Sequence, residues 1–148
     1  NGALAQADTL GIFGREGLDL AAYWADPGPE EPVTYAFRMY RNYDGQGSAF
    51  GETSVQAASA DPDRLAVYAA QREANGALTI MVINKTRQAQ EARIAIAGLP
   101  EAASAEVYRY SAEDLTAILR QADLETAADG LSAVFPASSI TLLVIPAR

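Results

Sequence analysis

The chain contains the stretch Ala77-Leu78-Thr79-Ile80-Met81-Val82-Ile83-Asn84-Lys85-Thr86, whose first eight residues predict a β-strand that Asn84-Lys85-Thr86 ends. Alternate side chains of a strand point to opposite faces. One face carries Leu78, Ile80 and Val82, and the other carries Thr79, Met81 and Ile83. Because both faces are largely apolar, we expect the strand to be covered on both and to lie centrally in a sheet. The clustered β-branched residues favour a strand over a helix.

The chain around this strand shows further short apolar segments separated by turn signals. Asn75-Gly76 is a hairpin signal, and Asp61-Pro62-Asp63 predicts a turn. Further strands are expected at 53–58, 65–71, 90–96, 104–110, 131–135 and 139–145. Residues 112–123 have no clear period and are expected to be irregular. Strands at this spacing predict a mainly β fold, an antiparallel β-sandwich over residues 53–148.

Residues 1–52 have a different, mixed α/β character, so we place a domain boundary near residue 52. A short helix over 2–10 should be broken by Gly11 and Gly14, and 17–24 should form a buried strand that ends on two aromatic residues. A proline-rich loop follows at 26–32, and then a helix over 33–43. Its expected apolar face carries Val33, Phe37 and Tyr40.

Composition limits the chemistry that the chain can perform. It has 148 residues of which 49% are hydrophobic, enough for a core, and it has neither cysteine nor histidine. Disulfides, thiolate sites and the commonest general base and zinc ligand are therefore excluded. No phosphate loop or metal-ligand spacing is present, so we expect no cofactor and no metal site.

The charge balance argues against two classes of partner. The formal net charge is −8, which repels phosphate backbones and anionic lipids. No apolar run approaches the ~20 residues of a membrane span. We therefore expect no nucleic-acid partner and no membrane partner. No signal peptide is present. Because the sequence opens on Asn1-Gly2-Ala3 without an initiator Met, we expect it to be a piece of a longer protein.

Charged residues provide weak catalytic or ligating candidates. Glu16 and Asp19 are the closest acidic pair of the first segment, but such pairs are frequent on surfaces. Asp44, Asp61 and Asp63 do not match a calcium loop. Arg38 and Arg41 lie three residues apart, which is typical of a solvated helix face or a local ion pair.

Aromatic residues provide a better candidate for ligand binding. The first segment contains Tyr23, Trp24, Tyr35, Tyr40 and Tyr43, and such rings can stack on sugars or pack a core. Tyr40 falls on the apolar helix face, which favours the core. Trp24 ends a predicted strand beside a proline loop, where binding residues gather, so both roles stay open for it.

Two groups of motifs carry a family likeness. The first group is Leu10-Gly11-Ile12-Phe13-Gly14-Arg15-Glu16-Gly17-Leu18-Asp19-Leu20, Tyr23-Trp24 and Ala36-Phe37-Arg38-Met39-Tyr40-Arg41-Asn42-Tyr43-Asp44-Gly45. The second group is Phe50-Gly51, Val67-Tyr68-Ala69-Ala70-Gln71-Arg72, Met81-Val82-Ile83-Asn84-Lys85-Thr86, Val107-Tyr108-Arg109-Tyr110-Ser111 and Ile140-Thr141-Leu142-Leu143-Val144-Ile145-Pro146. The first group resembles the last barrel segments of glycoside hydrolase family 44, and the second resembles the C-terminal β-sandwich of that family.

The resemblance implies a secreted bacterial enzyme that cleaves β-1,4-glucans such as cellulose or xyloglucan with retention, using a (β/α)₈ barrel joined to a sandwich. The two catalytic glutamates of the family lie on earlier barrel strands, before Asn1, so it implies no catalytic residue here. It implies substrate binding by Trp24 and its neighbour Tyr23 near the end of the last barrel strand. The implied partners are the catalytic barrel and a β-glucan polysaccharide.

Two alternatives stay open. The sandwich could be a carbohydrate-binding module that uses surface tyrosines, for which Tyr68, Tyr108 and Tyr110 are the candidates. The chain could also be an independent small enzyme, which would depend on carboxylates alone because it has neither histidine nor cysteine.

Overall fold

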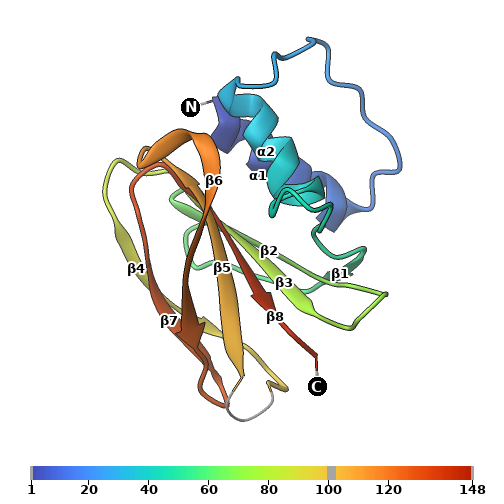
Figure 1. The fold of residues 1–148 in the computed structure, drawn as a ribbon. Coiled ribbons are helices and arrows are strands. Elements are labelled where there is room, and N and C mark those ends of the chain that lie inside the picture. Colours follow the sequence, from blue (N-terminus) through green and yellow to red (C-terminus); the bar gives the residue numbers. More distant parts are fainter. Residues whose placement is uncertain (1, 100–102, 148) are drawn as a thin grey trace.

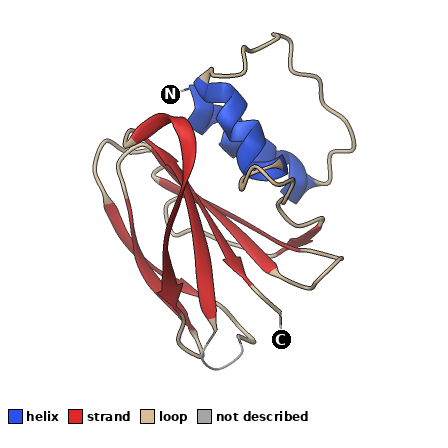
Figure 2. Cartoon of the chain, viewed as in Figure 1, coloured by secondary structure: helices blue, strands red, loops and turns tan. Residues whose placement is uncertain are grey.

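The computed structural model describes residues 2–99 and 103–147 and shows a mainly antiparallel β fold with a helical layer on one side (Figures 1 and 2). The two helices are α1 (Gly2–Glu16) and α2 (Pro32–Arg41). The strands are β1 (Thr53–Val55), β2 (Leu65–Gln71), β3 (Leu78–Asn84), β4 (Gln90–Ala95), β5 (Ser104–Ser111), β6 (Asp114–Glu125), β7 (Gly130–Phe135) and β8 (Ser139–Ile145). Neither of these helices is long and apolar enough to cross a membrane.

The strands form two sheets of unequal size. The larger sheet has six strands in the order β1-β2-β3-β8-β5-β6, and the smaller pairs β4 with β7. All described pairings are antiparallel. The small sheet lies on one face of the large one, and the helices lie on the other (Figure 1).

The central position of the strand 77–84 is confirmed, because β3 pairs with β2 on one side and with β8 on the other. Its two apolar faces contribute to two different cores. Met81 and Ile83 join the cluster beneath the helices, whereas Ile80 and Val82 join the cluster between the sheets. The strand is apolar on both faces because each face is covered by a separate layer.

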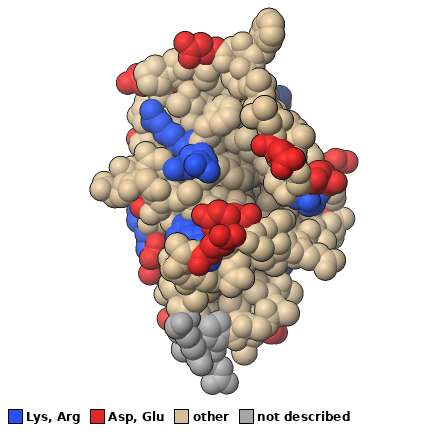
Figure 3. Space-filling model, turned by 90° about the vertical axis from the view of Figure 1, so that its right-hand side faces the viewer, with Lys and Arg blue, Asp and Glu red and all other residues tan. Residues whose placement is uncertain are grey.

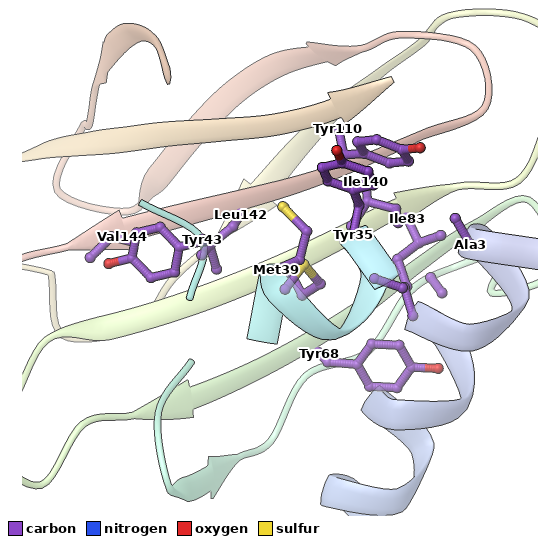
Figure 4. Close-up of a cluster of buried hydrophobic side chains, with 14 of the residues drawn as sticks. Ala3, Tyr35, Met39, Tyr43, Tyr68, Ile83, Tyr110, Ile140, Leu142 and Val144 are labelled. Carbon is purple, nitrogen blue, oxygen red and sulfur yellow. The ribbon is translucent and has the colours of Figure 1, made fainter. Parts of the chain in front are cut away.

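The cluster beneath the helices joins α1 and α2 to the large sheet (Figure 4). Tyr35 of α2 stacks on Tyr110 of β5, with ring centroids 4.8 Å apart and planes 7° apart. The ring centroids of Tyr43 and Tyr108 lie 4.4 Å apart, with their planes tilted by 60°. These tyrosines fill the interface between helices and sheet.

This packing rules out the row of sugar-binding tyrosines considered for a carbohydrate-binding module. Tyr68 and Tyr110 retain only 7% and 4% of their exposure, and Tyr108 is half-buried against Tyr43. All three lie on the sheet face that the helices cover, so the face is a core and not a platform for polysaccharide.

Asn84 fixes the end of the central strand. Its side chain is fully buried, and its Nδ2 donates to the carbonyl oxygens of Gln88, Phe135 and Pro136 at 2.8–2.9 Å. Its Oδ1 accepts from the backbone N–H and the hydroxyl of Thr86. One buried amide therefore joins the end of β3 to the β7–β8 turn, with its hydrogen bonds satisfied as burial requires.

Two expectations for the N-terminal segment are wrong. Helix α1 continues through Gly11 and Gly14 to Glu16, because single glycines weaken a helix without ending it and the buried stripe Ala3, Ala7 and Gly11 packs against the sheet. Residues 17–24 form no strand in this structure, and all of them are exposed. A strand needs a neighbour for its backbone groups, and none of the described residues supplies one.

Further corrections concern α2 and one expected strand. The fully buried residues of α2 are Tyr35, Ala36 and Met39, whereas Val33, Phe37 and Tyr40 are half-buried. The ring of Phe37 meets Tyr23, and Tyr40 meets Phe50 and packs against the edge of the core, as expected for it. The strand expected at 53–58 is limited to β1, Thr53–Val55.

The expectation that residues 112–123 are irregular is wrong, because they lie mostly within β6, the longest strand described. Register shifts between β5 and β6 disturb the alternation from which a strand is predicted. The turn at Asp61-Pro62-Asp63 and the remaining strands are confirmed to within a few residues.

Candidate substrate-binding site

Both candidate binding residues lie in the loop 17–31, which leaves the helical layer and returns to it (Figure 1). The loop begins where Gly17 adopts φ +68°, and the N–H of Leu18 donates to the carbonyl of Phe13 at 3.0 Å. This is a left-handed helix cap, which favours glycine because a side chain is strained there. The cap sets the direction in which the loop leaves α1.

The far end of the loop is tied to α2 by polar contacts. Thr34 Oγ1 donates to the carbonyl of Gly28 at 2.8 Å, and Arg38 Nη2 donates to that of Pro29 at 2.9 Å. The Arg38 guanidinium also lies over the ring of Tyr35, 4.8 Å from its centroid. Arg38 therefore has a structural role in holding the loop, and this role was not predicted.

The two candidate aromatics differ in how they are held. Tyr23 meets Phe37 of α2 edge-to-face, with centroids 5.6 Å apart, and keeps 46% of its exposure. Trp24 is fully exposed, at 101%, so a core role for it is excluded in this structure. An uncovered indole beside an anchored phenol offers a flat apolar face and a polar edge, which suits a sugar ring. Their role in substrate binding remains a prediction.

The same loop exposes other apolar side chains. Leu18 and Leu20 keep 50% and 87% of their exposure, alternating with the acidic Asp19. Scattered exposed leucines are normal on a surface, but four large apolar side chains within seven residues are typical of a segment that packs against something else.

The acidic residues near the loop do not form a catalytic pair. Glu16 accepts from Arg15 Nε at 2.9 Å, and both side chains are more than half exposed. Asp19 is also exposed. Within residues 2–99 and 103–147 no three acidic groups are placed to hold a metal ion. On the face drawn in Figure 3, acidic and basic side chains lie near one another and do not form a patch of one sign.

An ion-paired network that the sequence analysis missed holds α1 against the sheet. The carboxylate of Asp8 accepts from the Tyr68 hydroxyl at 2.7 Å and from Lys85 Nζ at 2.6 Å. Burial and the bond to Asp8 raise the pKa of Tyr68. Nearby, the Tyr40 hydroxyl donates to the carbonyl of Ala7 at 2.9 Å, and burial raises the pKa of Tyr40. These contacts join residues about 30 to 80 positions apart, so no local motif indicates them.

Gly11 allows α1 to approach β2 closely. A Cβ placed on Gly11 would lie 2.3 Å from Cδ2 of Tyr68. The ring of Tyr68 therefore occupies the space that any other side chain at this position would need. The small residues at positions 3, 7 and 11 form one stripe because they recur every four residues on a helix.

Comparison with known proteins gives matches over nearly the whole chain among solved structures. CelM2, a bifunctional glucanase-xylanase from a metagenome library, is 46% identical with a TM-score of 0.93, over 99% of this chain and 28% of that chain. A family 44 endoglucanase from Clostridium acetobutylicum is 26% identical (TM-score 0.89), over 97% of this chain and 29% of its own. A Paenibacillus polymyxa xyloglucanase of glycoside hydrolase family 44 is 28% identical (TM-score 0.88), over 98% of this chain and 29% of its own.

Curated sequences give a concordant result. The chain is 38% identical to a β-mannanase/endoglucanase A from Caldicellulosiruptor saccharolyticus over 112 residues, 74% of this chain and 8% of that protein. It is 42% identical to endoglucanase A from Paenibacillus lautus over 86 residues, 57% of this chain and 12% of that protein. No family model matches the sequence. The chain thus spans about a tenth of these curated relatives and less than a third of the solved chains.

Proposed function

Because the resemblance of this chain to the C-terminal part of glycoside hydrolase family 44 endoglucanases and xyloglucanases is confirmed over 97–99% of its length, we propose that it is the non-catalytic β-sandwich region of such an enzyme. Its role is to support a catalytic barrel that cleaves β-1,4-glucans with retention of configuration. Residues 1–52 are the terminal elements of that barrel, and residues 53–148 are the sandwich.

One observation carries this proposal: the helices share a single buried cluster with the large sheet. Met39 of α2 is fully buried among Met81, Ile83 and Leu142, and α1 is fastened to β2 through Asp8 and Tyr68. The helices that we assign to the barrel, α1 and α2, are therefore packed directly against the large sheet of the sandwich. A sheet that buries one face against barrel helices stabilises the barrel by the apolar area removed from water.

The exposed segment 17–24 is a second observation that supports the proposal. Its alternating Leu18 and Leu20 and its terminal Trp24 fit a last barrel strand whose neighbours lie outside these 148 residues. An eight-stranded barrel cannot close with one of its strands, so the segment stays extended and unpaired when those neighbours are absent.

The substrate is a β-glucan, and Trp24 with Tyr23 forms part of the surface that binds it. Active sites of such barrels lie at the carboxyl ends of the strands, which is where Trp24 would be placed if 17–24 were the last strand. The paired carboxylates of the reaction would come from earlier barrel strands. A polymeric substrate cannot enter a cell, so we also infer that the whole enzyme is secreted. We infer a bacterial source because the curated relatives come from the bacteria Caldicellulosiruptor saccharolyticus and Paenibacillus lautus.

The scaffold role is tested by deleting residues 53–148 from the intact parent protein. We expect the truncated protein to lose solubility and its hydrolysis of soluble xyloglucan or mixed-linkage glucan. The isolated 148-residue chain should hydrolyse neither polymer. An active, equally heat-stable truncation would refute the scaffold role, and hydrolysis by the isolated chain would restore the small-enzyme hypothesis.

A point variant refines the test. Met39→Ala in the parent removes a fully buried contact between α2 and the sheet, so it should lower the temperature of inactivation by several degrees. Val134→Ala, on a side chain that is 55% exposed on β7, is the matched control and should leave that temperature nearly unchanged. Equal effects of the two variants would show that the helix–sheet contact does not support the barrel.

A further inference from the structure

The two sheets leave an open groove along one side of the sandwich. The groove has a volume of ≈ 910 Å³ and lies between the face of β1, β2 and β3 and the strand β4. All residues of β4 line it, whereas β7 contributes Phe135, so the groove lies on the side of β4 away from its partner. We call this space, between β1–β2 and the unpaired edge of β4, the edge groove.

Both walls of the edge groove carry apolar side chains, beside polar ones such as Arg64 and Gln90. The large sheet contributes Val55, Leu65, Val67, Ala69, Leu78 and Ile80, and the β4 side contributes Ala92, Ile94 and Ile96. Val55 keeps 38% of its exposure, and Leu65, Val67 and Ala69 are half-buried in contrast to the fully buried Val82 further along the sheet. The small sheet is therefore too narrow to cover the large one, and the part near β1 and β2 is left open.

The edge of β4 offers backbone hydrogen bonds to this groove. The N–H of Ile96 donates to the carbonyl of Asp129 at 3.0 Å, toward the β7 side. Because the N–H groups of successive residues in a strand point to opposite edges, those of Glu91, Arg93 and Ala95 point to the open edge. Among residues 2–99 and 103–147 no backbone group pairs with these three N–H groups, so with the carbonyls beside them they form a template for one more strand.

The β4 edge lacks the usual protection against pairing. Its register with β7 is continuous from Gln90 to Ala95, without a bulge, and the strand contains no proline. Its two charged side chains, Glu91 and Arg93, are exposed, and the less exposed side chains that alternate with them, Gln90, Ala92 and Ile94, carry no charge. Exposed edges in folded proteins normally carry a bulge, a proline or an inward charge, so an edge of this kind is typical of a strand that is covered.

We propose that the edge groove is occupied by a strand from the part of the parent protein outside residues 1–148, which pairs with β4 and widens the small sheet. This inference rests on the proposed function, since the matched solved chains are more than three times as long as the region that this chain covers. The occupant is an extended segment of about six residues, to match β4, with every second side chain apolar. Backbone pairing provides affinity and the two apolar walls select the side chains.

Two other occupants fit less well. The exposed segment 17–24 of the same chain lies beside the helices, on the opposite side of the large sheet from β4 and β7 (Figure 1). The groove is lined by β4, so this segment is on the wrong face to occupy it. A second copy of the chain would bring together two molecules of formal charge −8, which repel one another. A strand of the same polypeptide has neither difficulty.

Hydrogen exchange tests the proposal. The exchange of single amides is measured by mass spectrometry with fragmentation, in the 148-residue chain and in the intact parent. The amides of Glu91, Arg93 and Ala95 should exchange at least about a hundredfold more slowly in the parent. The amides of Ala92 and Ile94, which already point to β7, serve as controls and should change far less. Equal exchange of the three edge amides in both proteins would overturn the proposal.

Photocrosslinking identifies the occupant in the same parent protein. With Val55→p-benzoylphenylalanine in the groove, a crosslink to a peptide outside residues 1–148 supports the proposal. A crosslink between two copies, or none, refutes it, and the same probe placed at the exposed Val134 is the control. Xyloglucan hydrolysis by the parent reports the proposed function separately. If the parent is active but its β4 edge amides are unprotected, only the proposed strand pairing is refuted. If the edge amides are protected but the parent is inactive, only the proposed glucanase function is refuted.

Discussion

Replacing each of two glycines in α1 by alanine should change stability in opposite directions. At Gly11 the new Cβ would lie 2.3 Å from Cδ2 of the Tyr68 ring, whereas at Gly14 no described atom outside the local helix lies within 4 Å of it. The Tyr68 ring cannot move freely, because its hydroxyl donates to Asp8 at 2.7 Å and the ring is buried beneath the helix. The two variants share one helix and one chemical change, so they isolate the effect of this contact.

The magnitudes follow from the two environments. Alanine in place of a helical glycine stabilises by about 0.5–1 kcal/mol, which is the whole expected effect of Gly14→Ala. At Gly11 the same gain is outweighed by overpacking, which costs about 1–3 kcal/mol, so Gly11→Ala should lose about 1–2 kcal/mol. Each kcal/mol corresponds to a shift of about 2–4 °C in the unfolding temperature of a chain of this size.

Urea denaturation followed by circular dichroism measures both variants against the original chain. Gly14→Ala should raise the midpoint and Gly11→Ala should lower it, with little change in the m-value. If Gly11→Ala proved as stabilising as Gly14→Ala, the close contact between α1 and Tyr68 would not exist in solution. The account of how the helical layer is fastened to the sheet would then be wrong.

Four further outcomes are expected. Asp8→Asn breaks the ion pair with the Lys85 ammonium and should lower the free energy of unfolding by about 1–3 kcal/mol, measured by the same urea titration. Glu16→Gln, at the exposed pair with Arg15, is the control and should change that free energy by less than about 0.5 kcal/mol. Burial holds the pKa of Tyr40 above its ordinary value in the folded chain, so the unfolded chain loses that proton first. The contribution of Tyr40 to stability should be constant below about pH 10 and then fall by up to about 1.4 kcal/mol per pH unit, and Tyr40→Phe should remove this part of the alkaline slope. Asn84→Ala leaves buried carbonyl groups without donors and should cost about 2–4 kcal/mol, and a loss below 1 kcal/mol in calorimetry would contradict this. Trp24→Ala should leave the stability of the 148-residue chain unchanged but lower kcat/KM of the parent on xyloglucan about tenfold or more, and an unchanged value would remove Trp24 from the binding surface.

The sheet was the most predictable part of this molecule from sequence. The apolar alternation of β3, together with Asn75-Gly76 before it and Asn84 at its end, indicated a central strand covered on both faces. Such a strand is predictable because its periodicity and its turn chemistry are both local properties of the sequence.

The errors occurred where the structure depends on distant contacts. Gly11 looks like a helix breaker until the Tyr68 ring, 57 residues away, is seen to need its space. Strand β6 was missed because bulges interrupt its alternation, and 17–24 has the composition of a strand without a neighbour in the described chain. For the candidate site, sequence indicated Trp24 and Tyr23, but it did not indicate the contacts of Phe37 and Arg38 that hold their loop.

The strand β3 belongs to both hydrophobic clusters, and this sharing affects how the protein responds to heat. The helical layer and the small sheet both pack on β3, so they should unfold in a single cooperative transition. Neither layer can be lost without exposing the strand that the other layer needs. The summed free energy of both layers then sets the melting temperature of the whole chain. A substitution that strengthens the β4–β7 pair, on the far side of the sheet, would consequently delay the detachment of α1 and α2.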